Sequence, residues 1–167
     1  MSKLAISLTV LVISYLIFFG YVAETYPELP AKIASHFDVS GKPNGWMSRG
    51  ACVEIMTAVA VLIPALVIGG MAGAGRIPVS FLNRPHRDFW LVPERRKSVL
   101  ALLLRYSIWF ATLNVLFLTG RLWLTVQANL HGGFHMNFAL LEILAVLYLA
   151  ATGIWLVLLV RRVSRIK

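Results

Sequence analysis

The chain has few of the residues and motifs that disulfide-linked domains and common catalytic sites require. It has one cysteine, Cys52, so no intramolecular disulfide can form, and no base adjacent in sequence would activate the thiol. It has no nucleophile elbow, no phosphate-binding glycine loop and no helical HExxH motif. We therefore expect a protein that is not an enzyme and that carries no cofactor.

Acidic residues are also scarce. The chain has 7 Asp and Glu against 16 Lys and Arg, which gives a formal net charge of +9. Such an excess is typical of nucleic-acid-binding proteins, but those proteins present a basic face interleaved with stacking aromatic residues. The basic residues of this chain instead flank apolar segments, so we expect no nucleic-acid partner.

Charge is missing altogether from long stretches. Residues 4–23, 55–75 and 143–160 contain no charged side chain, and each stretch has about 20 residues, enough to cross a bilayer as a helix. In a fourth apolar stretch, residues 98–127, the only charged residues are Arg105 and Arg121. The sequence predicts an all-α, four-helix transmembrane bundle formed by a single domain, residues 1–167, with helices at about 4–23, 52–75, 98–127 and 138–160.

The basic residues predict how this bundle is oriented. Most of them precede the first helix, follow the fourth, or lie in the connection 76–97. The connection 24–50 has only Lys32, Lys42 and Arg49. Because short cytoplasmic connections are rich in Lys and Arg, both termini and residues 76–97 are expected in the cytoplasm, with residues 24–50 as a structured extracytoplasmic loop. The expected location is the cell (inner) membrane, as a multi-pass protein.

The first and third helices differ in polarity. We interpret the first as uniformly apolar and aromatic, and therefore expect a lipid-facing anchor. In the third, Ser107, Asn114 and Arg121 recur every seven residues and share a face, while other polar residues occupy a second face. A helix that is polar on two faces is expected at the centre of the bundle.

Arg121 has two candidate partners at matching depth near the outer boundary. They are Glu54, at the start of the second helix, and Glu142, in the first turns of the fourth. One hypothesis is that Arg121 pairs with one of these carboxylates. The alternative is that its long side chain reaches the headgroup layer.

The outer loop contains strong turn signals. Residues 38–41 and 42–45 are rich in Asp, Gly, Pro and Asn, and the residues on either side could pair as a short hairpin. We expect His36, Asp38 and Trp46 to shape this loop above a charged layer formed by Glu54, Arg121 and Glu142.

These loop residues carry a family resemblance. Leu29-Pro30, Ile33-Ala34-Ser35-His36-Phe37 and Gly41-Lys42-Pro43-Asn44-Gly45-Trp46-Met47-Ser48-Arg49 resemble the domain of unknown function at the start of SdpI-type immunity proteins. The resemblance implies a bacterial integral membrane protein, and some relatives confer immunity to a secreted toxic peptide. Full immunity proteins have more membrane helices than the four expected here.

The inner connection has a second candidate surface. Aromatic residues there can anchor in the membrane interface while basic residues reach lipid phosphates. The alternative is a docking site for a cytoplasmic partner. The residues concerned are Asn83, His86, Trp90, Glu94, Arg95 and Arg96.

Three histidines are candidates for an outer metal site: His36, His131 and His135. Imidazoles and carboxylates are common zinc ligands. However, the glycines between His131 and His135 oppose the helix that would align the two rings. The alternative is that both are loop residues and that His36 is a structural hydrogen-bonding residue, with no metal bound.

Three functions remain open at this point. The first is a non-enzymatic protein that binds a ligand at its outer face, for immunity against a secreted peptide or for envelope sensing. The second is a component of a small transporter or channel, in which Asn114 and Arg121 line a polar path. The third is a metal-dependent enzyme at the outer face. The expected partners are the lipid bilayer and a secreted peptide or membrane protein, and a homo-oligomer is also open.

Overall fold

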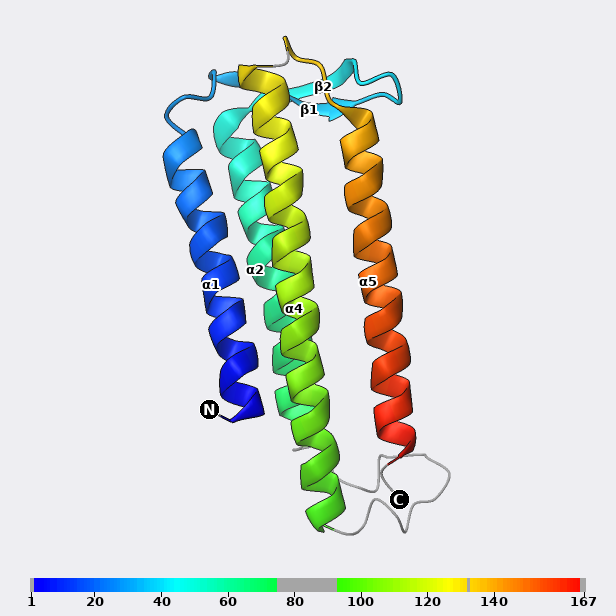
Figure 1. Ribbon diagram of the computed structural model, residues 1–167. Helices are drawn as coiled ribbons and strands as arrows, with labels where there is room; N and C mark the ends of the chain where they lie inside the picture. Colours follow the sequence, from blue (N-terminus) through cyan, green and yellow to red (C-terminus); the bar gives the residue numbers. More distant parts are fainter. Residues whose placement is uncertain (1, 75–92, 132, 166–167) are drawn as a thin grey trace.

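The computed structural model describes residues 2–74, 93–131 and 133–165. Within this part of the chain, four long helices run side by side and a β-hairpin lies across one end (Figure 1). The elements are α1 (Lys3–Thr25), β1 (Lys32–Phe37), β2 (Pro43–Ser48), α2 (Arg49–Ala74), α4 (Pro93–Leu130) and α5 (Phe138–Ser164). All four helices are long and apolar enough to cross a membrane, which confirms the predicted fold class.

Polar side chains cap the N-termini of three of these helices. Ser2 accepts a hydrogen bond from the Ala5 amide, and Ser48 accepts one from the Ala51 amide. At the start of α5, the Asn137 side chain accepts from the Leu140 amide at 3.1 Å. These oxygens satisfy amides that have no partner within their own helix. Compared with the predicted starts, α1 therefore begins one residue earlier, α2 begins three residues earlier, and α5 begins at the same residue.

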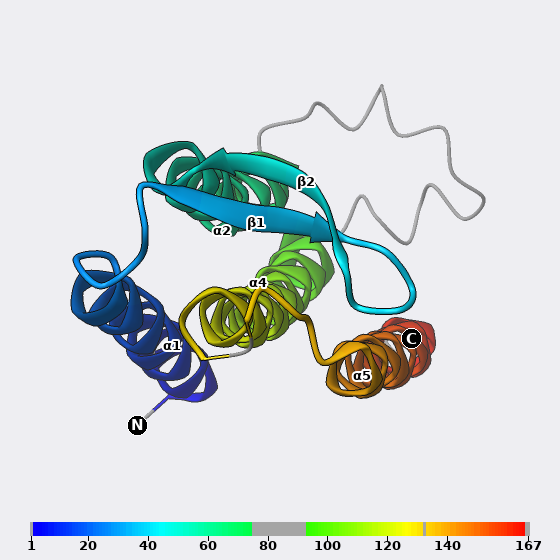
Figure 2. The same cartoon turned by 90° about the horizontal axis from the view of Figure 1, so that it is seen from above.

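The centre of the bundle is α4, as the polarity of this segment predicts. It packs against α1, α2 and α5, which lie on different sides of it (Figure 2). Its buried residues alternate at spacings of three and four, the period of left-handed helix packing. They include Ile108, Ala111, Val115, Leu118 and Leu122.

The expectation of a uniformly apolar, lipid-facing α1 is wrong for one face of the helix. Ser7 and Ser14 are fully or almost fully buried, and they share a face with Leu11 and Phe18. Each hydroxyl donates to a carbonyl of α1 itself, at Leu4 and Leu11 respectively. Because the small hydroxyls are satisfied internally, this face can pack closely against the bundle. Leu16, on the opposite face, is 68% exposed and suits lipid.

The hairpin of β1 and β2 confirms the pairing expected from the turn residues. The strands are antiparallel, with Ile33 opposite Met47 and Ala34 opposite Trp46. The hairpin crosses the end of the bundle above α2 and α4, and β1 is the strand closer to α4 (Figure 2). We call this end of the molecule the hairpin end.

A single side chain joins β1 to α4. The Ala34 amide donates to Asn129 Oδ1 at 2.8 Å, and Asn129 Nδ2 donates back to the Ala34 carbonyl at 2.9 Å. The same Nδ2 also donates to the Thr125 carbonyl of α4 at 2.8 Å. Asn129 therefore pairs with both backbone groups of Ala34 at the free edge of β1, as one residue of a third strand would. Both residues are buried.

In contrast, α5 contacts the bundle through one seam with α4. It has no buried residue. Asn114 Nδ2 donates to the Tyr148 hydroxyl at 3.1 Å, and the Trp155 indole N–H donates to the Tyr106 carbonyl at 2.9 Å. The α5 helix is thus the least enclosed of the four.

The Asn129 contact generates a stability prediction. Asn129→Leu keeps a similar volume but leaves the amide and carbonyl of Ala34 buried without partners, which we expect to cost about 2 kcal/mol or more. Thermal unfolding in lipid nanodiscs measures the loss. The control is Asn44→Leu, at an exposed position of β2. Equal unfolding temperatures for the two variants would contradict the role of Asn129.

Candidate functional site

Asp38 organises the tip of the hairpin. Its Oδ1 accepts hydrogen bonds from the Ser40 amide at 2.8 Å, the Ser40 hydroxyl at 2.7 Å and the Lys42 amide at 3.0 Å. The hydrogen bond from the Ser40 hydroxyl, followed by that from the Lys42 amide, holds the pKa of this carboxyl below its ordinary value. Asp38 is therefore committed to the turn, as a carboxylate at neutral pH.

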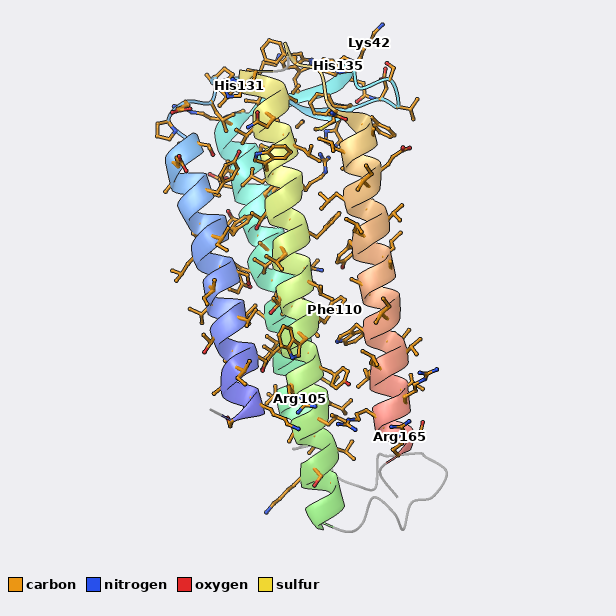
Figure 3. The ribbon with its side chains drawn as sticks, in the orientation of Figure 1. Lys42, Arg105, Phe110, His131, His135 and Arg165 are labelled. Atoms are coloured by element: carbon orange, nitrogen blue, oxygen red, sulfur yellow. The ribbon has the colours of Figure 1, made fainter. Side chains whose placement is uncertain are left out.

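The tip of the hairpin rests on the connection between α4 and α5. The Met136 amide donates to the Gly41 carbonyl at 2.9 Å. Gly41 has a φ of 82°, and a Cβ built on it would collide with the Met136 carbonyl and lie 2.6 Å from His135 Cε1. Only glycine combines this backbone conformation with so close an approach. Figure 3 shows His135 beside the hairpin, near Lys42.

Two exposed aromatic rings meet at this end. Trp46 of β2 and Phe134 have ring centroids 5.1 Å apart, and they are 44% and 37% exposed. Phe134 has a φ of 63°, a left-handed conformation that costs a residue with a side chain about 1–3 kcal/mol. Its amide donates to the Ala128 carbonyl at 2.8 Å, which fixes the backbone there. This hydrogen bond holds the strained residue in place, and its ring is partly exposed.

The histidines lie at the same end but not around one point. His36 is exposed, and its Nδ1 lies 3.1 Å from the Ser35 hydroxyl. His131 and His135 both line a hollow of about 240 Å³ between the end of α4 and the start of α5. Within residues 2–74, 93–131 and 133–165, no group of three or more His, Cys, Asp or Glu side chains is placed to hold a metal ion.

The hypothetical pair of Arg121 with Glu54 or Glu142 is not formed. No ion pair within 4.0 Å joins these described side chains, and both carboxylates belong to exposed residues. Arg121 is half-buried; its nearest described polar contact is the Thr125 hydroxyl at 3.5 Å, and it lies near Cys52 of α2. Matching depth along neighbouring helices does not decide which way each side chain points around its helix axis. The predicted charged layer of Glu54, Arg121 and Glu142 is therefore not formed by direct ion pairs.

Arg49 has a structural role that the sequence pattern did not indicate. Its guanidinium donates to the carbonyls of Tyr26, Pro27 and Leu29, the last at 2.8 Å. It also lies over the Tyr26 ring, 4.9 Å from the centroid. The first residue of α2 therefore holds the turn that follows α1. The only indication in the sequence was that a basic residue follows shortly after the aromatic Trp46. This pattern did not predict the carbonyls or the Tyr26 ring as the partners of Arg49.

The candidate surface in the inner connection is mostly outside this description. Asn83, His86 and Trp90 lie outside the described residues. Glu94 and Arg95 belong to the first turn of α4, but their side chains are also outside the description. Arg96 is half-buried in α4. The choice between a lipid contact and a docking site stays a prediction.

A family model covers the first part of the chain. Residues 10–68 match a domain of unknown function, DUF1648, which confirms that the chain carries such a domain. The match spans most of α1, the hairpin and most of α2, but not α4 or α5. No curated protein and no solved structure matches the chain.

The tip contact generates a prediction with a matched control. Gly41 and Gly133 both have positive φ, but a Cβ on Gly133 meets nothing within 4 Å. Gly133→Ala should cost only the backbone strain, about 1–2 kcal/mol. Gly41→Ala should cost about 1–3 kcal/mol more, because the methyl group collides with the α4–α5 connection. Thermal unfolding and protease sensitivity in nanodiscs measure both. Equal losses would show that the tip contact is not tight.

Proposed function

We propose that this chain is a non-enzymatic, multi-pass protein of the bacterial inner membrane that recognises a secreted peptide at its hairpin end. Immunity against such a peptide is the concrete form, and envelope sensing is the related one. The observation that carries the proposal is the exposed pair of Trp46 and Phe134, held in place at the hairpin end. Rigid, exposed aromatic residues are common anchors of peptide and protein recognition.

The distribution of charge supports an outer position for the hairpin. Every acidic residue with a described side chain lies in the hairpin, in the turn between α1 and β1, or in the half of a helix next to the hairpin: Glu24, Glu28, Asp38, Glu54 and Glu142. The opposite end, which we call the basic end, contains Lys3, Lys97, Arg161, Arg162 and Arg165. Basic ends of membrane bundles generally stay in the cytoplasm, so the hairpin would face outward.

The hairpin is also mechanically joined to the centre of the bundle. Asn129 links β1 to α4, and Gly41 links the tip to the α4–α5 connection. A peptide bound against Trp46 would therefore press on elements that continue through the membrane. This connection is what a sensing role requires, and in an immunity role it would hold the recognition surface rigid.

A transport path has less support. Asn114 is buried and donates to Tyr148, and Thr112 is buried and bonds to the Ile108 carbonyl of its own helix. Asn114 thus joins α4 to α5, and Thr112 is satisfied within α4. Asn114 does not line the hollow beside His131 and His135.

The orientation can be tested with single cysteines. In a Cys52→Ala background, Lys42→Cys should react with a membrane-impermeant maleimide in intact cells, because Lys42 is exposed at the hairpin tip. Arg161→Cys, exposed at the basic end, should react only after the membrane is permeabilised. The reverse pattern would place the hairpin in the cytoplasm and overturn the proposal.

Recognition can be tested by peptide challenge. Sensitive cells that express the chain are exposed to a panel of purified bacterial antimicrobial peptides, and growth inhibition is measured. We expect protection against at least one peptide, and a loss of about tenfold in protection for Trp46→Ala combined with Phe134→Ala. The control is Val39→Ala, which shortens an apolar side chain that is 81% exposed on the same hairpin.

Two outcomes would contradict this function. One is full protection by the double variant at equal expression, which would move the recognition surface away from the two rings. The other is that expression of the wild-type chain changes growth inhibition by none of the peptides in the panel, which would contradict the immunity form.

A further inference from the structure

A second hollow lies at the other end of the molecule, far from the hairpin. It is a groove of about 610 Å³ that crosses α4 between α1 and α5, which lie on different sides of α4 (Figure 2). The groove is open on one side, where Trp109 of α4 remains 37% exposed. The residues that matter for its chemistry are Lys3 and Ile6 of α1, Arg105 and Trp109 of α4, and Ile154 and Leu158 of α5.

The lining combines two cations with an apolar wall. Lys3 and Arg105 line the same groove, and neither forms an ion pair with a carboxylate among the described side chains. Figure 3 shows Arg105 in the lower part of α4, below Phe110. The remaining lining is almost entirely aliphatic and aromatic. Such a lining complements a molecule with an anionic head and an apolar tail.

The groove is held open by contacts within the protein. The Trp155 indole N–H donates to the Tyr106 carbonyl at 2.9 Å, and both residues line the groove. The Trp155 ring also packs against Phe110, with centroids 5.2 Å apart. These contacts fix α5 against α4 at the level of the groove, so the site is formed before a ligand arrives.

The depth of the groove suits a membrane lipid. Lys3 is the first residue of α1, whose 23 residues extend about 35 Å at 1.5 Å per residue. This length is close to the apolar thickness of a bilayer, so Lys3 lies near the boundary with the headgroups. Arg105 lines the same groove, twelve residues into α4, and its guanidinium can reach the same layer. The apolar wall then extends toward the middle of the membrane.

We propose that this groove is a binding site for an anionic phospholipid, with its phosphate between Lys3 and Arg105 and an acyl chain along Trp109, Ile154 and Leu158. The occupant is a lipid of the leaflet at the basic end, because the groove opens sideways from membrane-spanning helices. The site is independent of the hairpin and of peptide recognition. A lipid seated there bridges α1 and α5, which otherwise meet the bundle mainly through α4.

Native mass spectrometry of the purified full chain tests the site. Phosphatidylglycerol and phosphatidylcholine with identical acyl chains are titrated separately into the detergent-solubilised protein. We expect the wild-type chain to bind one phosphatidylglycerol about tenfold more tightly than phosphatidylcholine. Lys3→Gln combined with Arg105→Gln should remove this preference and leave the weak binding of phosphatidylcholine unchanged.

A matched control separates the groove from the general charge of this end. Lys97→Gln combined with Arg161→Gln removes the same charge from exposed positions outside the groove. This control should keep the preference within about twofold of the wild type. If it loses the preference as fully as the groove variant does, the effect is a diffuse surface charge and the site is wrong.

A second variant keeps the test decisive if the charge variant folds poorly. Ile154→Trp fills the acyl part of the groove and leaves both cations in place. It should lose the tightly bound phosphatidylglycerol. Unchanged binding in this variant would overturn the groove as the binding site. A dimer of the wild-type chain that Trp109→Ala dissociates would show that a second copy, and not a lipid, covers this face.

Discussion

The hydrogen bonds between Asn129 and Ala34 are the constraint that anchors the β-hairpin to the helix bundle. A two-stranded hairpin is marginally stable alone, and an unpaired strand edge buried against a helix end would be costly. The Asn129 side chain removes this cost by pairing with both backbone groups of Ala34. The hairpin can therefore lie flat on the bundle with a definite register. Trp46 is the cross-strand partner of Ala34, so its place at the hairpin end follows from this anchoring.

The segment that matches DUF1648 packs its core side chains against a helix outside the match. Residues 10–68 contribute Phe18, Ile33 and Cys52 to the core, but these side chains belong to one cluster with residues of α4. The α1 and α2 helices pack mainly on α4, with the bond from the Tyr15 hydroxyl to the Ala60 carbonyl as a direct link between them. The domain therefore depends on a helix that lies outside the match.

Apolar runs predicted the four helices, turn residues predicted the hairpin, and polar residues on two faces predicted the central place of α4. These features follow from local composition, since a span needs only length and a hairpin needs only its turn. The contacts that define the site are not local. Asn129 lies 95 residues from Ala34, and nothing in its own segment separates it from other polar residues of α4. For Arg121 the sequence suggested a contact that is not formed. Depth in the membrane alone indicated Glu54 and Glu142 as partners, but the directions of the side chains around the helix axes do not bring them together.

The two hollows follow the α4–α5 seam because of how the seams of α4 differ. On the α1 side, Ser7 and Ser14 are small and buried, which permits close packing against the bundle. On the α5 side, contacts between large rings alternate with a close approach: Phe117 stacks on Tyr148 at 4.4 Å and Phe110 packs on Trp155, whereas a Cβ on Gly120 would lie only 3.0 Å from Leu144. Side chains of unequal size therefore leave the α4–α5 seam unevenly filled, with one hollow at the histidines and another at Lys3 and Arg105, where Trp155 is part of the lining.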